Sequence, residues 1–164
     1  MLKEIKKTYF DLRKIKKNKY NRSLSFGDYF TDRQERADFE NFGKGTTVYD
    51  NVLILGDVKV GKNTWIGPFT ILDGSGILII GSNCSISSGV QIYTHDTIKW
   101  AVSGGESPYE YGNVIVEDNC YIGPNSIIEK GVIIKSGTIV GANSYVNKCF
   151  PKGSKIAGNP AKQI

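Results

Sequence analysis

The sequence predicts an all-β protein: a parallel β-helix of about five coils, with a short helical segment before it and one long excursion loop. Three observations carry this prediction. An aliphatic or aromatic residue returns at every sixth position across most of residues 42–164. A small or β-branched residue stands four positions after most of them, and glycine often follows the first position directly.

A six-residue period fits neither the 3.6-residue period of a helix nor the alternation of a long strand. It fits a short strand and a turn with two inward side chains, so that three units close one coil of about 18 residues, and coils stack at about 4.8 Å. The predicted inward apolar positions are Phe42, Val48, Ile54, Val60, Ile66, Leu72, Ile80, Ile86, Ile92, Val116, Ile122, Ile128, Ile134, Val140 and Val146. The predicted inward small positions are Thr46, Val52, Val58, Thr64, Thr70, Cys84, Val90, Cys120, Ser126, Val132, Thr138 and Ser144.

The glycines of the repeat are expected at the corners of the coils, where the backbone turns tightly. Cys84 and Cys120 occupy small inward positions and are therefore predicted to be core residues. With Cys149 they make an odd number of cysteines, at spacings unlike any metal motif, beside a single histidine. We therefore predict no metal site.

Residues 1–41 form the predicted N-terminal segment, which is basic and partly helical. Residues 1–22 hold nine basic and two acidic side chains, a local charge of +7, whereas the remainder balances to −2. Because the basic excess is confined to one end, no nucleic-acid partner is expected. The helix either packs its apolar stripe on the β-helix or a neighbouring subunit, or makes a peripheral contact with an anionic membrane. The stripe consists of Leu2, Ile5, Tyr9, Leu12 and Ile15.

The chain is long enough for a domain with a real core, and it contains no apolar run of about 18 residues. Its first residues, MLKEIKKTYF, lack the features of a signal peptide. A cytoplasmic protein with reduced thiols is therefore expected.

The repeat over residues 42–164 closely resembles that of the hexapeptide-repeat acyltransferases. The resemblance implies a left-handed β-helix, an exception to the usual right-handed crossover. It also implies a homotrimer that binds acetyl-CoA in clefts between subunits.

The long interruption follows the stretch QIYTHDT and gives a predicted loop over residues 96–114. Polar and aromatic side chains in it are suited to gripping a sugar, and we expect Trp100, Tyr109 and Tyr111 to bind substrate. The location resembles that of the loop in the maltose and galactoside O-acetyltransferases. That resemblance implies that His95 is the general base and that Glu110 belongs to its polar network. A base fits the chemistry, since a sugar hydroxyl is a poor nucleophile until its proton is removed.

A shorter interruption, DGSG, begins at Asp73. It is either a simple turn insertion or a feature of the coil beside His95. In the second case Asp73 is expected to contact the acceptor.

The segments NCYIGPNSII and IVGANSYVNKCFPKGSKIAGNPAKQI resemble those that line the coenzyme cleft in these acetyltransferases. Two departures are that Tyr121 replaces the usual tryptophan and that Pro124 has no backbone N–H to donate. The cofactor-binding residues implied by the resemblance are Pro124, Ala142, Asn147, Lys148 and Lys162.

The expected function is transfer of acetyl from acetyl-CoA to a saccharide hydroxyl, in surface polysaccharide biosynthesis. The alternative is N-acetylation of a nucleotide-linked amino sugar, although no Gly-rich nucleotide fingerprint accompanies the repeat. A rival of another class is a β-helix that serves as an assembly scaffold or a carbonic-anhydrase-like enzyme. The latter needs several histidines, and a scaffold has no need of the loop.

Overall fold

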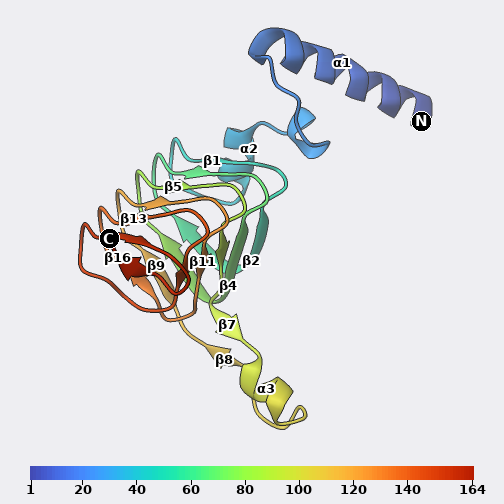
Figure 1. Ribbon diagram of the computed structural model, residues 1–164. Coiled ribbons are helices and arrows are strands. Elements are labelled where there is room, and N and C mark those ends of the chain that lie inside the picture. The colour runs from blue at the N-terminus through green and yellow to red at the C-terminus, as the bar shows by residue number, and fades with distance from the viewer.

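The computed structural model describes residues 1–164 and confirms a left-handed parallel β-helix, preceded by a helical N-terminal segment (Figure 1). The segment contains helix α1 (Leu2–Tyr20), the 3-10 helix η1 (Gly27–Tyr29) and helix α2 (Arg33–Phe39). Within one chain α1 packs on η1 rather than on the β-helix, and none of its residues is buried. No helix of the chain combines the length and the apolar character needed to cross a membrane.

The coils of the β-helix stack as parallel strands, with β16 added antiparallel at the end. One face is formed by β1 (Thr47–Val48), β3 (Trp65–Ile66), β5 (Ser85–Ile86), β10 (Tyr121–Ile122), β13 (Ile139–Val140), β15 (Lys155–Ala157) and β16 (Lys162–Gln163). The second sheet is formed by β2 (Leu53–Val60), β4 (Ile71–Ile80), β6 (Gln91–Ile92), β9 (Val114–Val116), β11 (Ile127–Ile128), β12 (Ile133–Ile134) and β14 (Tyr145–Val146). The first face contains six parallel strands, against about five predicted coils, because β15 adds a coil beyond the predicted repeat.

The core confirms the predicted inward positions. Ile66, Ile86, Ile122 and Val140 pair in register through four successive coils, and each is fully buried. The small positions beside them, Thr64, Cys84, Cys120 and Thr138, are buried too. The hydroxyl of Thr64 donates to the carbonyl of Gly81 in the next coil at 2.8 Å, whereas that of Thr138 has no partner. The exceptions are Ile54 and Val58, which are half-buried in β2, where β4 is the only neighbouring strand in the sheet.

The glycines that follow the apolar positions are needed for a different reason than predicted. A Cβ on Gly43 would lie 2.4 Å from the carbonyl carbon of Gly61, and one on Gly123 would lie 2.6 Å from the nitrogen of Ala142. These glycines allow adjacent coils to approach, and they do not adopt positive φ.

Asparagine supplies the left-handed backbone at many of the turns. Asn63, Asn83 and Asn119 occupy equivalent places in successive coils, with φ of 53°, 55° and 62°. Asparagine tolerates this region better than other residues with a Cβ, because its short side chain can hydrogen-bond locally. Asparagine and glycine therefore share most of these places, and Phe69 at φ 60° and Ile77 at φ 77° are the exceptions.

Neighbouring isoleucines in β11 test the inward phase of the repeat. Ile128 is fully buried, whereas Ile127 beside it is 36% exposed. Ile128→Ala should lower the free energy of unfolding by about 2–5 kcal/mol, because it leaves a cavity in the stack. The matched Ile127→Ala should cost about 0.5 kcal/mol. Denaturant unfolding at one protein concentration measures both, and equal losses would show that the assigned phase is wrong.

Candidate active site

The long interruption forms an arm that leaves the β-helix at one edge (Figure 1). It contains the two-stranded antiparallel ribbon of β7 (His95–Asp96) and β8 (Glu110–Tyr111), and between them the short helix α3 (Ile98–Val102). The predicted loop over 96–114 therefore has secondary structure of its own. His95 stands where the chain leaves the coil, at the base of this arm.

The closest partner of His95 is a carboxylate from the neighbouring coil. Its Nδ1 lies 2.7 Å from Oδ2 of Asp73. The Asp73 side chain is 1% exposed, whereas that of His95 is 29% exposed. One nitrogen of the ring is thus engaged inside the protein, while the ring as a whole still reaches the surface.

Asp73 is held by hydrogen bonds on both carboxylate oxygens. Oδ2 also accepts from the backbone nitrogen of Thr94 at 2.9 Å, and Oδ1 accepts from the backbone nitrogen of Ser75 at 3.0 Å and from its hydroxyl. Burial alone would raise the pKa of Asp73, but the hydrogen bonds from Ser75, Thr94 and His95 together hold this pKa far below its ordinary value. The carboxylate is therefore ionised and fixed in place.

The DGSG interruption explains how this carboxylate reaches His95. Leu72 pairs with Ile92, so Asp73 lies beside the turn through which Thr94 and His95 leave the coil. Gly56 pairs with Gly74 and Val58 with Leu78, so β4 has three residues where β2 has one. The extra residues of β4 form the bend. Both glycines are required there, since a Cβ on Gly76 would lie 2.5 Å from the carbonyl oxygen of Thr94, and one on Gly74 would lie 2.3 Å from that of Asp57. The interruption is therefore part of the site and not only a turn insertion.

Glu110 does not contact His95, and the hydrogen bond that orients the ring is the one to Asp73. The ribbon pairs His95 with Tyr111 and Asp96 with Glu110. Because side chains alternate between the faces of a strand, Glu110 and Asp96 share the face opposite to His95.

Glu110 instead takes part in an ion-pair network at the base of the arm. Its carboxylate pairs with Lys99 and, at 3.5 Å, with Lys130, which also lies 3.2 Å from Asp96. The hydrogen bond from Lys99, with the nearby charge of Lys130, lowers the pKa of Glu110. Asp96 also accepts from the backbone nitrogen of Ile98 at 2.9 Å, which fixes the turn into α3. These contacts fix the arm to the β-helix.

The three aromatic residues predicted to bind substrate all lie on the arm. The ring of Tyr111 stacks on that of His95, with centroids 6.0 Å apart. Trp100 and Tyr109 pack edge to face at 5.7 Å further along the arm. All three are exposed, so the arm presents aromatic surface, and Tyr111 presents it next to the histidine.

The residues implied to bind the coenzyme occupy two corners and the last strand. Pro124 and Ala142 are stacked in adjacent coils, where the carbonyl of Pro124 accepts from the nitrogen of Asn143 at 2.9 Å. Asn147 and Lys148 follow β14 at another corner, and Lys162 lies in β16. One chain therefore does not bring these residues into a single cluster.

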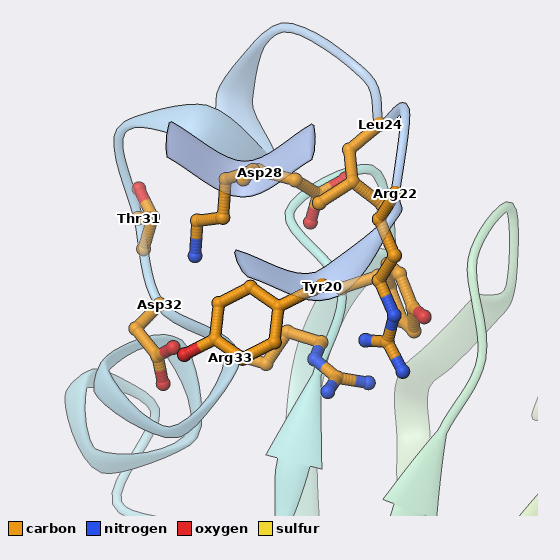
Figure 2. Close-up of a pocket in the computed structure, with 9 residues that line it drawn as sticks. Tyr20, Arg22, Leu24, Asp28, Thr31, Asp32 and Arg33 are labelled. Atoms are coloured by element: carbon orange, nitrogen blue, oxygen red, sulfur yellow. The ribbon is translucent and has the colours of Figure 1, made fainter. Parts of the chain in front are cut away.

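The cavities of the chain lie elsewhere. All four are lined by residues between Phe10 and Phe69, and none includes His95; Figure 2 shows the one beside Tyr20 and Arg33. No group of three or more histidine, cysteine, aspartate or glutamate side chains is placed to hold a metal ion.

Sequence reasoning missed several residues of the site. Thr94 is buried, and its hydroxyl joins the carbonyl of Asp73 at 2.9 Å to the nitrogen of Gly76 at 2.8 Å. Ser75 and Lys130 were missed as well. Adding the two-residue slip of the repeat to the 18-residue coil pairs Leu72 with Ile92 and would have brought Thr94 close to Asp73. No sequence signal identifies Lys130 as a partner of Glu110.

Comparisons with known proteins begin with a sequence profile described as the bacterial transferase hexapeptide (six repeats), which matches residues 113–148. A tetrahydropyridine-dicarboxylate N-succinyltransferase of Wolbachia sp. subsp. Brugia malayi is 36% identical over 41% of this chain and 21% of its own length. A Schizosaccharomyces pombe protein, provisionally named an acetyltransferase, is 35% identical over 58% of this chain and 45% of its own. The chain thus spans less than half the length of these curated relatives. An Escherichia coli protein, provisionally named colanic acid biosynthesis acetyltransferase WcaF, is 28% identical over 73% of this chain and 69% of its own.

Two solved structures share the architecture. The hexapeptide-repeat acetyltransferase VCA0836 of Vibrio cholerae O1 biovar eltor, solved with acetyl-CoA, covers 99% of this chain and 86% of its own at a TM-score of 0.71 and 22% identity. That likeness concerns the fold. AntD, an N-acyltransferase from Bacillus cereus solved with dTDP and 3-hydroxybutyryl-CoA, covers 75% of this chain and 70% of its own at a TM-score of 0.68 and 25% identity. A variant of AntD was solved with dTDP-4-amino-4,6-dideoxyglucose and coenzyme A.

The depressed pKa of Asp73 predicts how stability depends on pH. A carboxyl whose folded pKa is lowered stabilises the fold above its unfolded pKa of about 3.9, and this contribution is lost as the pH falls further towards the folded pKa. At pH 7, Asp73→Asn should therefore lower the free energy of unfolding by about 1–3 kcal/mol, the worth of hydrogen bonds to a charged group. The difference from wild type should shrink below about pH 4. Asp57→Asn, at an exposed carboxylate, is the control and should show no such trend. A difference that stays constant from pH 7 to pH 3 would contradict the assignment.

Proposed function

We propose that this chain, which belongs to the hexapeptide-repeat transferase family, transfers an acetyl group from acetyl-CoA to a hydroxyl group of a saccharide. The observation that carries the proposal is the pair of His95 and Asp73 at the base of an aromatic arm. A histidine fixed by a buried carboxylate, with its other nitrogen unengaged, is the arrangement that general-base catalysis requires. The surface-polysaccharide context is supported by the similarity to WcaF.

The tautomer of His95 follows from its contact. An ionised Asp73 only accepts hydrogen bonds, so Nδ1 carries a proton and donates a hydrogen bond to Oδ2. In the neutral ring the lone pair then lies on Nε2. This nitrogen is the base, and Asp73 is a positioning residue that also stabilises the imidazolium.

The reaction balances on this one base. Nε2 of His95 takes the proton of the acceptor hydroxyl while the oxygen attacks the thioester carbonyl. A C–O bond forms, the C–S bond breaks, and the imidazolium returns its proton to the departing thiolate. The products are an acetyl ester and free coenzyme A.

The arm positions the acceptor in this proposal. Tyr111, stacked on His95, forms one wall for a sugar ring, and Trp100 and Tyr109 extend the aromatic surface outward. Glu110 forms ion pairs with Lys99 and Lys130, and these hold the arm in place. Asp73 is too buried to contact the acceptor, so its part is limited to His95.

The coenzyme is expected to lie between subunits of a homotrimer. Pro124 and Ala142 offer a corner for the pantetheine arm, and Asn147, Lys148 and Lys162 offer polar and basic groups for the rest. Their separation on one chain supports a shared cleft, to which two subunits contribute different corners. The neighbours solved with acetyl-CoA or coenzyme A support this choice of donor. A cytoplasmic location fits the three free thiols of the chain.

A second candidate is N-acylation of a nucleotide-linked amino sugar. It is favoured by the similarity to AntD, an N-acyltransferase solved with such a sugar. The two candidates differ in their need for a base, because a neutral amine attacks a thioester without prior loss of a proton. Incubation with acetyl-CoA and a panel of glycans, amino sugars and nucleotide sugars, followed by mass spectrometry, identifies the acceptor class.

Removal of the base should separate the candidates. For a hydroxyl acceptor, His95→Ala should lower kcat/KM by about 10²–10⁴, the usual worth of a positioned general base. Asp73→Asn should cost about 10–100-fold, as loss of a group that orients a functional histidine does. Glu110→Gln should cost less than about tenfold, since Glu110 does not touch the ring.

Steady-state kinetics on the identified acceptor provides these values, and thermal unfolding confirms that each variant is folded. A His95→Ala variant with near wild-type activity on a hydroxyl acceptor would overturn the mechanism. The same result on an amine would support the second candidate instead.

Lys162 tests the coenzyme assignment. Lys162→Ala should raise KM for acetyl-CoA by about 5–30-fold with little change in kcat, because a contact remote from the thioester binds ground and transition states alike. This rise in KM corresponds to a loss of about 1–2 kcal/mol in the binding free energy of acetyl-CoA. Lys44→Ala, at an exposed lysine of the first coil, is the matched control. An unchanged KM in the Lys162 variant would remove Lys162 from the cleft.

A further inference from the structure

The N-terminal helix α1 presents one face that the proposed function does not use. Residues at intervals of three, four and seven lie on the same side of a helix. This spacing places one phenylalanine among five cations, and all six side chains are exposed. We call this set the basic face; it consists of Lys3, Lys6, Phe10, Arg13, Lys14 and Lys17.

The cations of the basic face have no anionic partner within the chain. No ion pair of the structure includes any of them. Residues 1–22 carry a local charge of +7, whereas the rest of the chain balances to −2. Charge complementarity therefore favours an anionic partner, and it disfavours the α1 helix of a second copy.

An exposed aromatic cluster adjoins this face. Tyr9 contacts Phe10 and Phe26, with centroids 5.6 and 5.1 Å apart, and Phe26 contacts Phe30 at 4.9 Å. Phe10, Phe26 and Phe30 are nevertheless 53%, 56% and 46% exposed. We call these four residues the aromatic cluster. Large apolar rings grouped at the surface mark a site of interaction.

A small cavity at the same end of the molecule adds further cations. It has a volume of about 140 Å³ and is lined by Lys16, Arg22 and Arg33 together with two acidic residues, as Figure 2 shows in part. The acids are already engaged, since Asp28 accepts from the nitrogen of Asp50 and Asp32 accepts from that of Gln34. The three cations form no ion pair, so the cavity offers positive charge to an incoming anionic group.

We propose that the basic face and the aromatic cluster together form a peripheral docking surface for membranes that contain anionic phospholipids. Such a bilayer can bind both parts of the surface. Its phosphate groups attract the lysines and arginines, and its interfacial region buries the phenylalanine rings. Figure 1 shows α1 projecting from the β-helix, at the end away from the arm, so docking leaves the arm accessible. The proposal is independent of acetyl transfer, because binding is measured without substrates.

The test is flotation of the full chain with vesicles. Vesicles of phosphatidylcholine alone are compared with vesicles that contain phosphatidylglycerol as well. The chain should float with the anionic vesicles only, and binding should weaken as salt is raised, because ions screen charges at a surface. Lys14→Gln combined with Lys17→Gln should lower the partition coefficient about 10–30-fold, since each basic residue near an anionic surface contributes several-fold.

Two further variants complete the design. Phe10→Ser combined with Phe26→Ser should lower partitioning about tenfold or more while the charge is unchanged. Lys44→Gln combined with Lys62→Gln removes the same charge from exposed sites on the β-helix and should leave binding unchanged. Circular dichroism and thermal unfolding verify that all variants are folded.

Several outcomes would overturn the proposal. They are absence of flotation, equal binding to neutral vesicles, and equal loss in the β-helix control. Binding to a single-stranded oligonucleotide, or α1-dependent self-association, with both vesicle types left unbound would assign the surface to another partner.

Discussion

The in-register stacking of coils is the constraint on which the rest of the structure depends. Each strand is hydrogen-bonded to the equivalent strand of the next coil, so a residue lies beside the one about 18 positions away in sequence. The same constraint explains the apolar stack, the small inward residues and the glycines that allow coils to approach. It also fixes which residues can meet at a corner, and hence where a site can be built.

The candidate site arises where that stacking is interrupted twice at the same corner. The extra residues after Gly74 bend β4, and Asp73, which directly precedes Gly74, contacts Thr94 of the next coil. The arm begins in that next coil, and His95, its first residue, lies within hydrogen-bond distance of Asp73. A buried carboxylate and a partly exposed histidine are thereby joined, although they lie 22 positions apart in the chain. The rigid coil supplies the positioning residue, and the arm supplies the base and the aromatic surface.

The sequence predicted the core well because burial on a β-helix repeats with a period that can be counted. Ile122 and Ile128 needed no further information, since their neighbours in both directions obey the same rule. The role of the repeat glycines was harder to predict, because close approach of coils and positive φ both favour glycine. An asparagine such as Asn83 indicates a place that needs positive φ.

The site was predictable as a location but not as a set of contacts. His95 stood out as the sole histidine at the start of the only long interruption. Whether Glu110 could contact His95 depended on the face of the ribbon on which Glu110 lies. The pairing of His95 with Tyr111 sets that face. That register is determined by the packing of the arm, through Lys130 and Lys99, and the six-residue repeat carries no information about it.

Nitrogen-15 NMR of the imidazole tests the central claim most directly, because the single histidine gives one pair of ring-nitrogen signals. At a pH where the ring is neutral, the contact with Asp73 predicts a protonated Nδ1 and an unprotonated Nε2 that couples to both ring-carbon protons. Asp73→Asn should abolish this fixed preference. A spectrum showing Nε2–H as the dominant tautomer in the wild-type protein would contradict the account, since the proposed base would then already hold its proton.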